Sequence, residues 1–297
     1  MLTDTEIDEI MARVRRLEIK ARRLVRESFS GQYLSSFRGQ GIDFDDYREY
    51  QHGDETRFID WNVTARMQQP YVRKFHEERE ANVVIAVDIS GSVDYGSINY
   101  SKREIAAEAA AVLGFSALHN GDKVGLLLFA NEPVLFIPPE KGSRHLLRMV
   151  REILAARPDN PATSIRAACD FLIRTLRRKS VVFMISDFQS DPLDKPLGKL
   201  ARKHDTIALR VGDPLERDLP QVGTVTMVDP ETGFETKVNT RNPNLRMAYG
   251  KMAARHRQGV RGVFRKHGID HAPLHTDGDI FMSLLRMLKR RARRRTR

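Results

Sequence analysis

Hydrophobic residues recur every three or four positions near the start of the chain. This spacing is typical of a helix with one apolar face, and Thr3 and Glu6 have the spacing of a capping box at its start. We therefore predict an amphipathic helix that ends near Glu27. Residues 29–80 contain short aromatic and charged stretches punctuated by glycine, with no helical period, so we expect irregular structure with few strands there.

From residue 82 onward, short continuous apolar runs replace this pattern, and helical sequence separates each run from the next. The runs predict strands over residues 83–87, 124–129, 134–137, 181–185, 207–211 and 269–274, of which 134–137 is a short edge strand. Strands that alternate with helices indicate βαβ units joined by right-handed crossovers. We therefore predict an α/β fold, with a doubly wound, mainly parallel sheet covered by helices on both faces.

The pattern also predicts how the chain is divided. We expect residues 1–80 to form an N-terminal helix and an extension packed on the core, and residues 81–297 to form the α/β domain with a basic C-terminal tail. An alternating stretch between Val222 and Val238, broken by turn-forming residues, predicts a β-hairpin inserted into this domain.

Oxygen-bearing side chains follow two of the predicted strands and open one helix. The candidate residues are Asp88, Ser90 and Ser92 after strand 83–87, Asp187 after strand 181–185, and Thr163, which lies between the two strands in sequence and opens the helix that begins near Ser164. Ligands of such sheets bind at the carboxyl ends of the strands, where these residues should meet. For each residue taken alone, we favour the explanation that it is an ordinary turn or cap residue. Together they are hard oxygen ligands, which suit Mg²⁺ or Mn²⁺ better than zinc.

The order of a strand followed by Asp-x-Ser-x-Ser, a threonine opening a helix, and a second strand followed by Asp resembles the metal-ion-dependent adhesion site of von Willebrand factor A domains. The resemblance implies that Ser90, Ser92 and Thr163 contact a divalent ion, and that Asp88 and Asp187 hold it directly or through water. It also implies that a carboxylate from a partner protein completes the octahedron. The chain departs from the family at Thr163, which has neither the usual preceding Gly nor the usual following Asp.

The segment before the α/β region carries a second resemblance. The stretches Gly-Gln-Gly-Ile-Asp-Phe at 39–44, Arg-Glu-Tyr at 48–50 and Arg-Phe-Ile-Asp-Trp at 57–61 resemble the signature of the domain-of-unknown-function 58 family. That resemblance implies a partnership with MoxR-type AAA+ ATPases, beside which such proteins are often encoded. It also implies a cytosolic member, because the membrane hairpin that precedes the signature in many relatives is not seen here.

The same segment allows two physical interpretations. Its interleaved acids and arginines suit an ion-pair network that pins the segment to the core, because guanidinium forks match carboxylates. Alternatively, Trp61 and an arginine anchor a partner. We favour the structural interpretation.

The net charge of +11 first suggests a nucleic acid or an anionic surface as partner. Eight of the positive charges lie in the last twelve residues, which contain no acid: Arg286, Lys289, Arg290, Arg291, Arg293, Arg294, Arg295 and Arg297. These cations suit the C-terminal end of a last helix, and we favour that explanation over an arm for nucleic acid or lipid, because no aromatic residue interleaves them.

Several function classes have no support in the sequence. There is no P-loop and no nucleophile-elbow motif, which argues against an ATPase and a serine hydrolase. His271 and His275 have no Cys or acid in metal-ligand spacing, and the single cysteine, Cys169, lies in an apolar helical stripe. Apolar runs are too short to span a bilayer, and no secretory pattern opens the sequence, so we expect a cytoplasmic protein.

We therefore expect a non-enzymatic, divalent-metal-dependent protein-interaction module that acts as adaptor or co-chaperone to a MoxR-type ATPase. One alternative is a Mg²⁺- or Mn²⁺-dependent enzyme on nucleic acid that uses Asp88 and Asp187. Another is a metal-free scaffold whose site has degenerated.

Overall fold

A computed structural model of the chain describes residues 4–26, 33, 36–37, 42–77, 80–97, 100–190 and 192–295. The chain forms two units: residues 1–36 and 82–297 make the larger one, and residues 37–81 make the smaller one.

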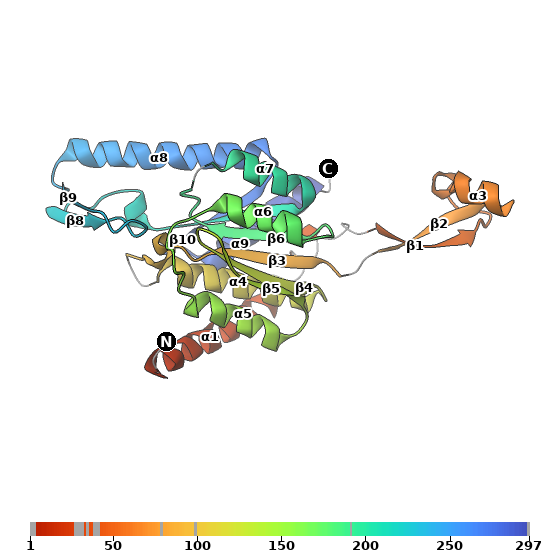
Figure 1. The fold of residues 1–297 in the computed structure, drawn as a ribbon, viewed down its shortest axis with the longest axis horizontal. Coiled ribbons are helices and arrows are strands. Elements are labelled where there is room, and N and C mark those ends of the chain that lie inside the picture. The colour runs from red at the N-terminus through yellow and green to blue at the C-terminus, as the bar shows by residue number, and fades with distance from the viewer. Residues whose placement is uncertain are drawn as a thin grey trace. The chain divides into compact units, whose positions relative to one another are not determined.

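A six-stranded sheet lies at the centre of the larger unit, with the strand order β10-β7-β6-β3-β4-β5 (Figure 1). Its strands are β3 (Asn82–Asp88), β4 (Lys123–Phe129), β5 (Pro133–Glu140), β6 (Val181–Ser186), β7 (Asp205–Gly212) and β10 (Asp270–His275). All neighbouring strands pair in parallel except β5, which runs antiparallel at the edge. The predicted strands and the edge position of β5 are therefore confirmed.

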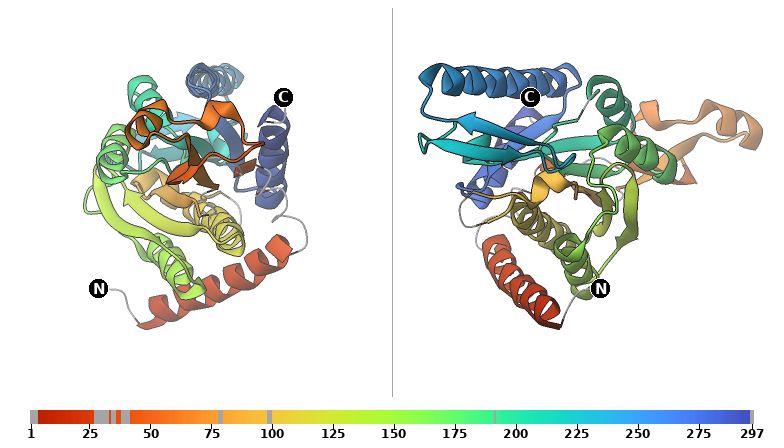
Figure 2. Two further views of the ribbon diagram at one scale, coloured as in Figure 1. Left: turned by 90° about the vertical axis from the view of Figure 1, so that its right-hand side faces the viewer. Right: turned by 60° about the vertical axis from the view of Figure 1, so that its left-hand side comes forward.

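Helices cover both faces of this sheet, as the alternating pattern predicted (Figures 1 and 2). One face carries α1 (Asp4–Leu24), α4 (Lys102–His119), α5 (Ser143–Ala155) and α9 (Ile280–Arg295). The other face carries α6 (Ile165–Thr175), α7 (Asp194–Lys203) and α8 (Pro243–Lys266). The fold is thus a von Willebrand factor A-like, doubly wound α/β fold. In the described part of the chain, no helix combines the length and the apolar character needed to cross a membrane.

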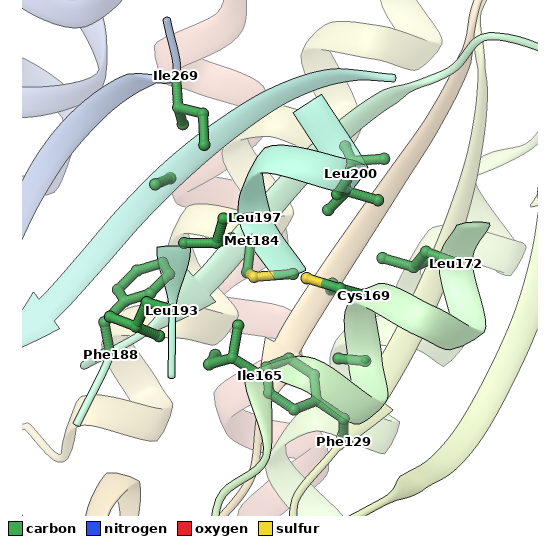
Figure 3. Close-up of a cluster of buried hydrophobic side chains, with 14 of the residues drawn as sticks. Phe129, Ile165, Cys169, Leu172, Met184, Phe188, Leu193, Leu197, Leu200 and Ile269 are labelled. Atoms are coloured by element: carbon green, nitrogen blue, oxygen red, sulfur yellow. The ribbon is translucent and has the colours of Figure 1, made fainter. Parts of the chain in front are cut away.

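A cluster of buried side chains fills the space between the sheet and α6, α7 and α8 (Figure 3). Met184 of β6 and Leu197 of α7 are fully buried in it, and so is Cys169 of α6. The thiol is therefore a core group, and burial raises its pKa well above the ordinary value. Replacing a buried leucine by alanine in a protein core costs about 2–5 kcal/mol.

The N-terminal helix belongs to the larger unit, which differs from the predicted division at residue 80. Val14 and Ala21 of α1 are buried, and the helix packs on α4 and α5. Lys20 Nζ lies 2.7 Å from Glu108 Oε1 of α4. An amphipathic helix needs an apolar partner for its hydrophobic face, and α4 supplies one.

The smaller unit corrects the expectation of irregular, strand-poor structure over 29–80. β1 (Ile42–Glu49) and β2 (Tyr71–Glu77) pair antiparallel, joined through η2 (Thr56–Phe58) and α3 (Trp61–Met67). Arg48 donates two hydrogen bonds to Asp54, at 2.8 and 2.7 Å, which together hold the pKa of that carboxyl below its usual range. This arginine–carboxylate pair lies within the smaller unit, and Trp61 is 69% exposed. The predicted ion-pair network that pins the segment to the core stays a prediction.

The inserted hairpin is confirmed as β8 (Thr224–Val228) and β9 (Glu235–Asn239). The basic C-terminal segment forms α9, as expected for a last helix. Its arginines do not only interact with the C-terminal end of the helix dipole; one of them also forms buried ion pairs. Arg291 is buried and pairs with Asp270 at 2.6 Å and also with Asp205. Part of the tail charge is therefore neutralised inside the fold.

Candidate functional site

The candidate residues lie where the strand order of the sheet reverses. The chain proceeds from β3 to β4 and β5 on one side, and from β6 to β7 and β10 on the other. β3 and β6 are therefore neighbours, with Val87 opposite Ile185 in parallel register. The loops that follow two such strands diverge and leave a crevice at their carboxyl ends. Asp88 and Asp187 occupy the start of these loops.

Asp88 is 1% exposed, and both its carboxylate oxygens accept hydrogen bonds. The backbone N–H of Ser90 donates to Oδ1 at 3.0 Å, and Ser186 Oγ donates to Oδ2 at 2.6 Å. Burial, followed by the negative charge of Asp187, raises the pKa of Asp88 to about 7. The two carboxylates are thus close enough to oppose each other's ionisation, which is the electrostatic condition that a bound cation relieves.

The two serines connect these carboxylates. Ser90 is fully buried and its Oγ lies 3.2 Å from Ser92 Oγ, while the Ser92 hydroxyl hydrogen-bonds to Asp187. Four of the five predicted residues, Asp88, Ser90, Ser92 and Asp187, are therefore joined in one polar cluster at the sheet edge.

A lysine that the sequence analysis did not single out completes this cluster. Lys102 Nζ, on the first residue of α4, lies 2.8 Å from Asp187 Oδ2 and 2.5 Å from Glu216 Oε1, and the side chain is 1% exposed. Although burial acts in the opposite direction, this ammonium holds the pKa of Asp187 below its ordinary value. A lysine in the first turn of a helix opposes the helix dipole, and this was the available signal that Lys102 has an acidic partner.

Glu216 is fixed in turn by its own loop. It ends η4 (Pro214–Glu216), whose cap residue Asp213 is buried. Asp213 accepts hydrogen bonds from Ser97 Oγ at 2.5 Å and Thr276 Oγ1 at 2.7 Å. These bonds hold the loop in place, so that the Glu216 carboxylate faces Lys102.

Thr163 lies on the third loop and makes a contact that the sequence did not indicate. Its hydroxyl donates to Glu231 Oε1 at 2.7 Å, and Glu231 belongs to the turn of the β8–β9 hairpin. The helix cap at this point is Ser164, which accepts from the N–H of Ala167, and not Thr163. The Thr163 hydroxyl is thus not used as a helix cap; its hydrogen is donated to Glu231, and its oxygen keeps lone pairs that could face a cation.

Gly91 joins the Thr163 loop and the hairpin turn to the first loop. Its N–H donates to Pro161 O at 2.8 Å. A Cβ at this position would lie 2.4 Å from Pro230 O and 3.1 Å from Pro161 Cβ, which no side chain tolerates. The close approach therefore requires glycine, and it brings three loops together around the cluster.

The donor set fits a hard divalent cation. It offers two carboxylates and three hydroxyls, the ligand type that Mg²⁺ and Mn²⁺ prefer. Within the described ranges, no three His, Cys, Asp or Glu side chains group in a metal-binding arrangement, so the hydroxyls are needed to complete a site. Burial is the main cause of the raised pKa of Asp88, and the nearby charge of Asp187 adds to it.

Comparison with known proteins gives relatives but no activity. The sequence pattern of the family described as "Protein of unknown function DUF58" matches residues 46–259. The uncharacterized protein Rv1480 of Mycobacterium tuberculosis is 32% identical over 295 residues, which cover 98% of this chain and 92% of that protein. The uncharacterized protein YeaD of Bacillus subtilis is 30% identical over 112 residues, covering 38% of this chain and 26% of that protein.

Among solved structures, the conserved hypothetical protein BatB of Bacteroides thetaiotaomicron is similar, with a TM-score of 0.45 and 17% identity. It covers 72% of this chain and 99% of its own. An aerotolerance-related membrane protein of Bacteroides fragilis gives a TM-score of 0.44 and 18% identity, with the same coverage.

Proposed function

The chain belongs to the DUF58 family of proteins of unknown function, and on that premise we propose that it is a protein-interaction module that works through a divalent ion. One observation carries the proposal. Two buried carboxylates that follow neighbouring strands, Asp88 and Asp187, lie with serine hydroxyls at the sheet edge where the strand order reverses, and the pKa of Asp88 is about 7.

The residues that would hold the ion are Asp88, Ser90, Ser92, Thr163 and Asp187. When bound, Mg²⁺ or Mn²⁺ supplies a coordination position that a partner carboxylate fills reversibly. The chain's own residues orient these donors. Ser186 and the N–H of Ser90 fix the Asp88 carboxylate by hydrogen bonds. Glu231 accepts a hydrogen bond from the Thr163 hydroxyl and thereby orients the lone pairs of that oxygen.

The partner in this proposal is a MoxR-type AAA+ ATPase in the cytoplasm, as the family resemblance implies. The ATPase supplies nucleotide-driven work, because this sequence contains no P-loop, and the module acts as adaptor or co-chaperone without catalysis of its own.

The test is a binding measurement between the purified full chain and the ATPase, in Mg²⁺ and in EDTA. Asp88→Asn keeps the shape of the side chain and removes its charge, and the exposed Asp159→Asn, on the loop before Thr163, is the matched control. We expect EDTA and Asp88→Asn to abolish association, and Asp159→Asn to leave it unchanged. Association that survives both EDTA and Asp88→Asn contradicts the proposal.

The metal-free scaffold has one observation in its favour. The Lys102 ammonium already provides Asp187 with a positive charge at 2.8 Å. Calorimetric titration with Mg²⁺ and Mn²⁺ separates the two functions, since the scaffold predicts no binding to the folded chain with or without the partner.

A further inference from the structure

A cavity of about 450 Å³ lies between α8 and β10, away from the candidate metal residues. It is lined by Ala254, Arg257, Gln258, Arg261, Arg265 and His271. Pockets for small ligands have volumes of roughly 300–1,000 Å³, so this cavity has room for a compact molecule.

Three arginines follow one another along one wall of this cavity. Arg257, Arg261 and Arg265 are four residues apart, and each step therefore corresponds to about 6 Å along the helix. The row flanks Val260 and Phe264, which are the residues of α8 that are buried. The buried residues fix the rotation of the helix and thereby aim the row at the cavity.

This concentration of charge is not balanced by neighbouring acids. Seven of the 24 residues of α8 are Arg or Lys and none is Asp or Glu. Like charges four residues apart destabilise a helix, so the arrangement has an electrostatic cost in the absence of an anion. The end of the same helix shows the contrast, because Lys266 pairs with Asp194 at 2.8 Å. Across the described ranges, no carboxylate forms an ion pair with any of the three cavity arginines.

Alongside burial, positive charge from the cavity arginines contributes to lowering the pKa of two neighbouring groups, Arg210 and His271. Burial lowers the pKa of Arg210 on β7, and the charges of Arg257 and Arg261 lower it further, while Glu216 and Asp187 raise it. The pKa of His271 is also lowered, by burial and then by Arg290, with a smaller effect of Arg261. The cavity therefore carries a positive potential that an anion would neutralise.

The lining identifies the kind of anion. Guanidinium groups bind phosphate in a bidentate manner, and three of them in a row match a ligand with several negative oxygens close together. The lining contains no Phe, Tyr or Trp on which successive bases of a nucleic acid would stack. The lining comes from two elements only, and Arg261 and Arg265 are exposed, so the pocket is a partly open hollow of limited volume. Such a hollow suits a small molecule better than a continuous strand.

We propose that this cavity, the α8 arginine pocket, binds a small molecule that carries two or more linked phosphate groups. Arg257, Arg261 and Arg265 bind the phosphate oxygens, and His271 on the opposite wall offers a further hydrogen bond. The inference is independent of the proposed metal function, because none of these residues belongs to the Asp88 site.

The test is isothermal titration of the full chain with pyrophosphate, tripolyphosphate and ATP, with EDTA present so that no divalent ion contributes. The test variant is Arg257→Gln with Arg261→Gln. The control is Lys251→Gln with Arg255→Gln, which removes the same charge from exposed positions of α8 outside the lining. We expect the test variant to lose at least about tenfold in affinity and the control to stay within about twofold.

The ATP arm distinguishes the source of the phosphates. Equal affinities for ATP and tripolyphosphate assign recognition to the phosphate chain alone, whereas tighter ATP binding assigns the pocket to a nucleotide. A melting curve checks folding, and the unliganded test variant should be at least as stable as the wild type because a like-charge pair is gone.

Three outcomes overturn the proposal. The first is no binding of either polyphosphate at millimolar concentration, and the second is an equal loss in test and control variants. The third is single-stranded DNA binding that tightens with strand length and exceeds that of tripolyphosphate, because a nucleic-acid surface would then replace the small-molecule pocket.

Discussion

Replacing Lys102 by methionine separates the structural and the metal-binding roles of the site. The ammonium of Lys102 lies 2.8 Å from Asp187 and 2.5 Å from Glu216, and Asp187 is fully buried. Methionine fills a similar volume without charge, so the substitution leaves a buried carboxylate without its cation, beside the second carboxylate of Asp88. Removing one partner of a buried pair costs about 3–5 kcal/mol. We expect Lys102→Met to lower the free energy of unfolding by this amount in EDTA, which corresponds to a fall in melting temperature on the order of 10 °C.

Divalent ions should restore much of this loss if the site binds them. A ligand that binds only the folded state at a hundred times its dissociation constant stabilises it by about 2.7 kcal/mol. Because Lys102 competes with a cation for Asp187, Lys102→Met should bind Mg²⁺ more tightly than the wild type does. The variant should therefore gain more stability from Mg²⁺ than the wild type gains.

Thermal unfolding followed by circular dichroism, in EDTA and in Mg²⁺ at equal ionic strength, checks both statements. Lys199→Met, at an exposed position of α7, is the matched control and should behave as the wild type in both buffers. A Lys102→Met protein as stable as the wild type in EDTA would refute the electrostatic reasoning. A destabilised protein that Mg²⁺ does not restore would refute the metal site and favour the metal-free scaffold.

Three further predictions concern neighbouring groups. The pKa of Asp88 rises from 3.8 to about 7 on folding, so without metal the folded protein holds this proton more tightly than the unfolded chain does. The resulting stabilisation is fully present below pH 4 and is lost as the pH rises to 7, at up to about 1.4 kcal/mol per pH unit. Asp88→Asn should flatten this dependence in denaturation curves measured at several pH values. Glu231→Ala removes the acceptor of the Thr163 hydroxyl and should weaken Mg²⁺ binding by about tenfold or more in calorimetric titration, with little additional effect in a Thr163→Ala background. Arg291→Met should cost about 3–5 kcal/mol in urea unfolding, whereas the exposed Arg293→Met should change stability by less than about 0.5 kcal/mol.

The sheet and the inner part of the site were predictable because their signals are local. A strand buried on both faces requires an unbroken apolar run, such as Val83–Val87, and the residues just after it must lie at the sheet edge. The hairpin around residue 230 was predictable for the same reason, since alternation and a turn signal lie within a few residues. Asp88 and Asp187 could therefore be placed together although they are far apart in the sequence. Ser186, which hydrogen-bonds to Asp88, is 98 residues away from it.

The remaining features depend on contacts between distant segments. The strand β1 has the sequence Ile-Asp-Phe-Asp-Asp-Tyr-Arg-Glu, which has no continuous apolar run of the kind that marks the central strands. The position of Lys102 in the first turn of its helix indicates an acidic partner, but only the fold identifies that partner as Asp187. Arg291 resembles the other arginines of its segment, and only the docking of α9 beside Asp205 and Asp270 distinguishes it.

The charges that surround the inner cluster restrict what kind of partner can reach it. The carboxylates and hydroxyls of the inner cluster are oxygen ligands that suit any hard cation. They alone would not discriminate among partner proteins. Glu216 and Glu231 add negative charge around them, from η4 and from the β8–β9 turn. A partner that offers only a carboxylate would be repelled by these two acids as it approaches. A partner surface that pairs its carboxylate with neighbouring cations meets complementary charge instead, which raises the association rate and excludes purely acidic surfaces. If the proposed function holds, we therefore expect the two glutamates to set partner selectivity, although they come from loops far along the chain from Asp88 and Asp187.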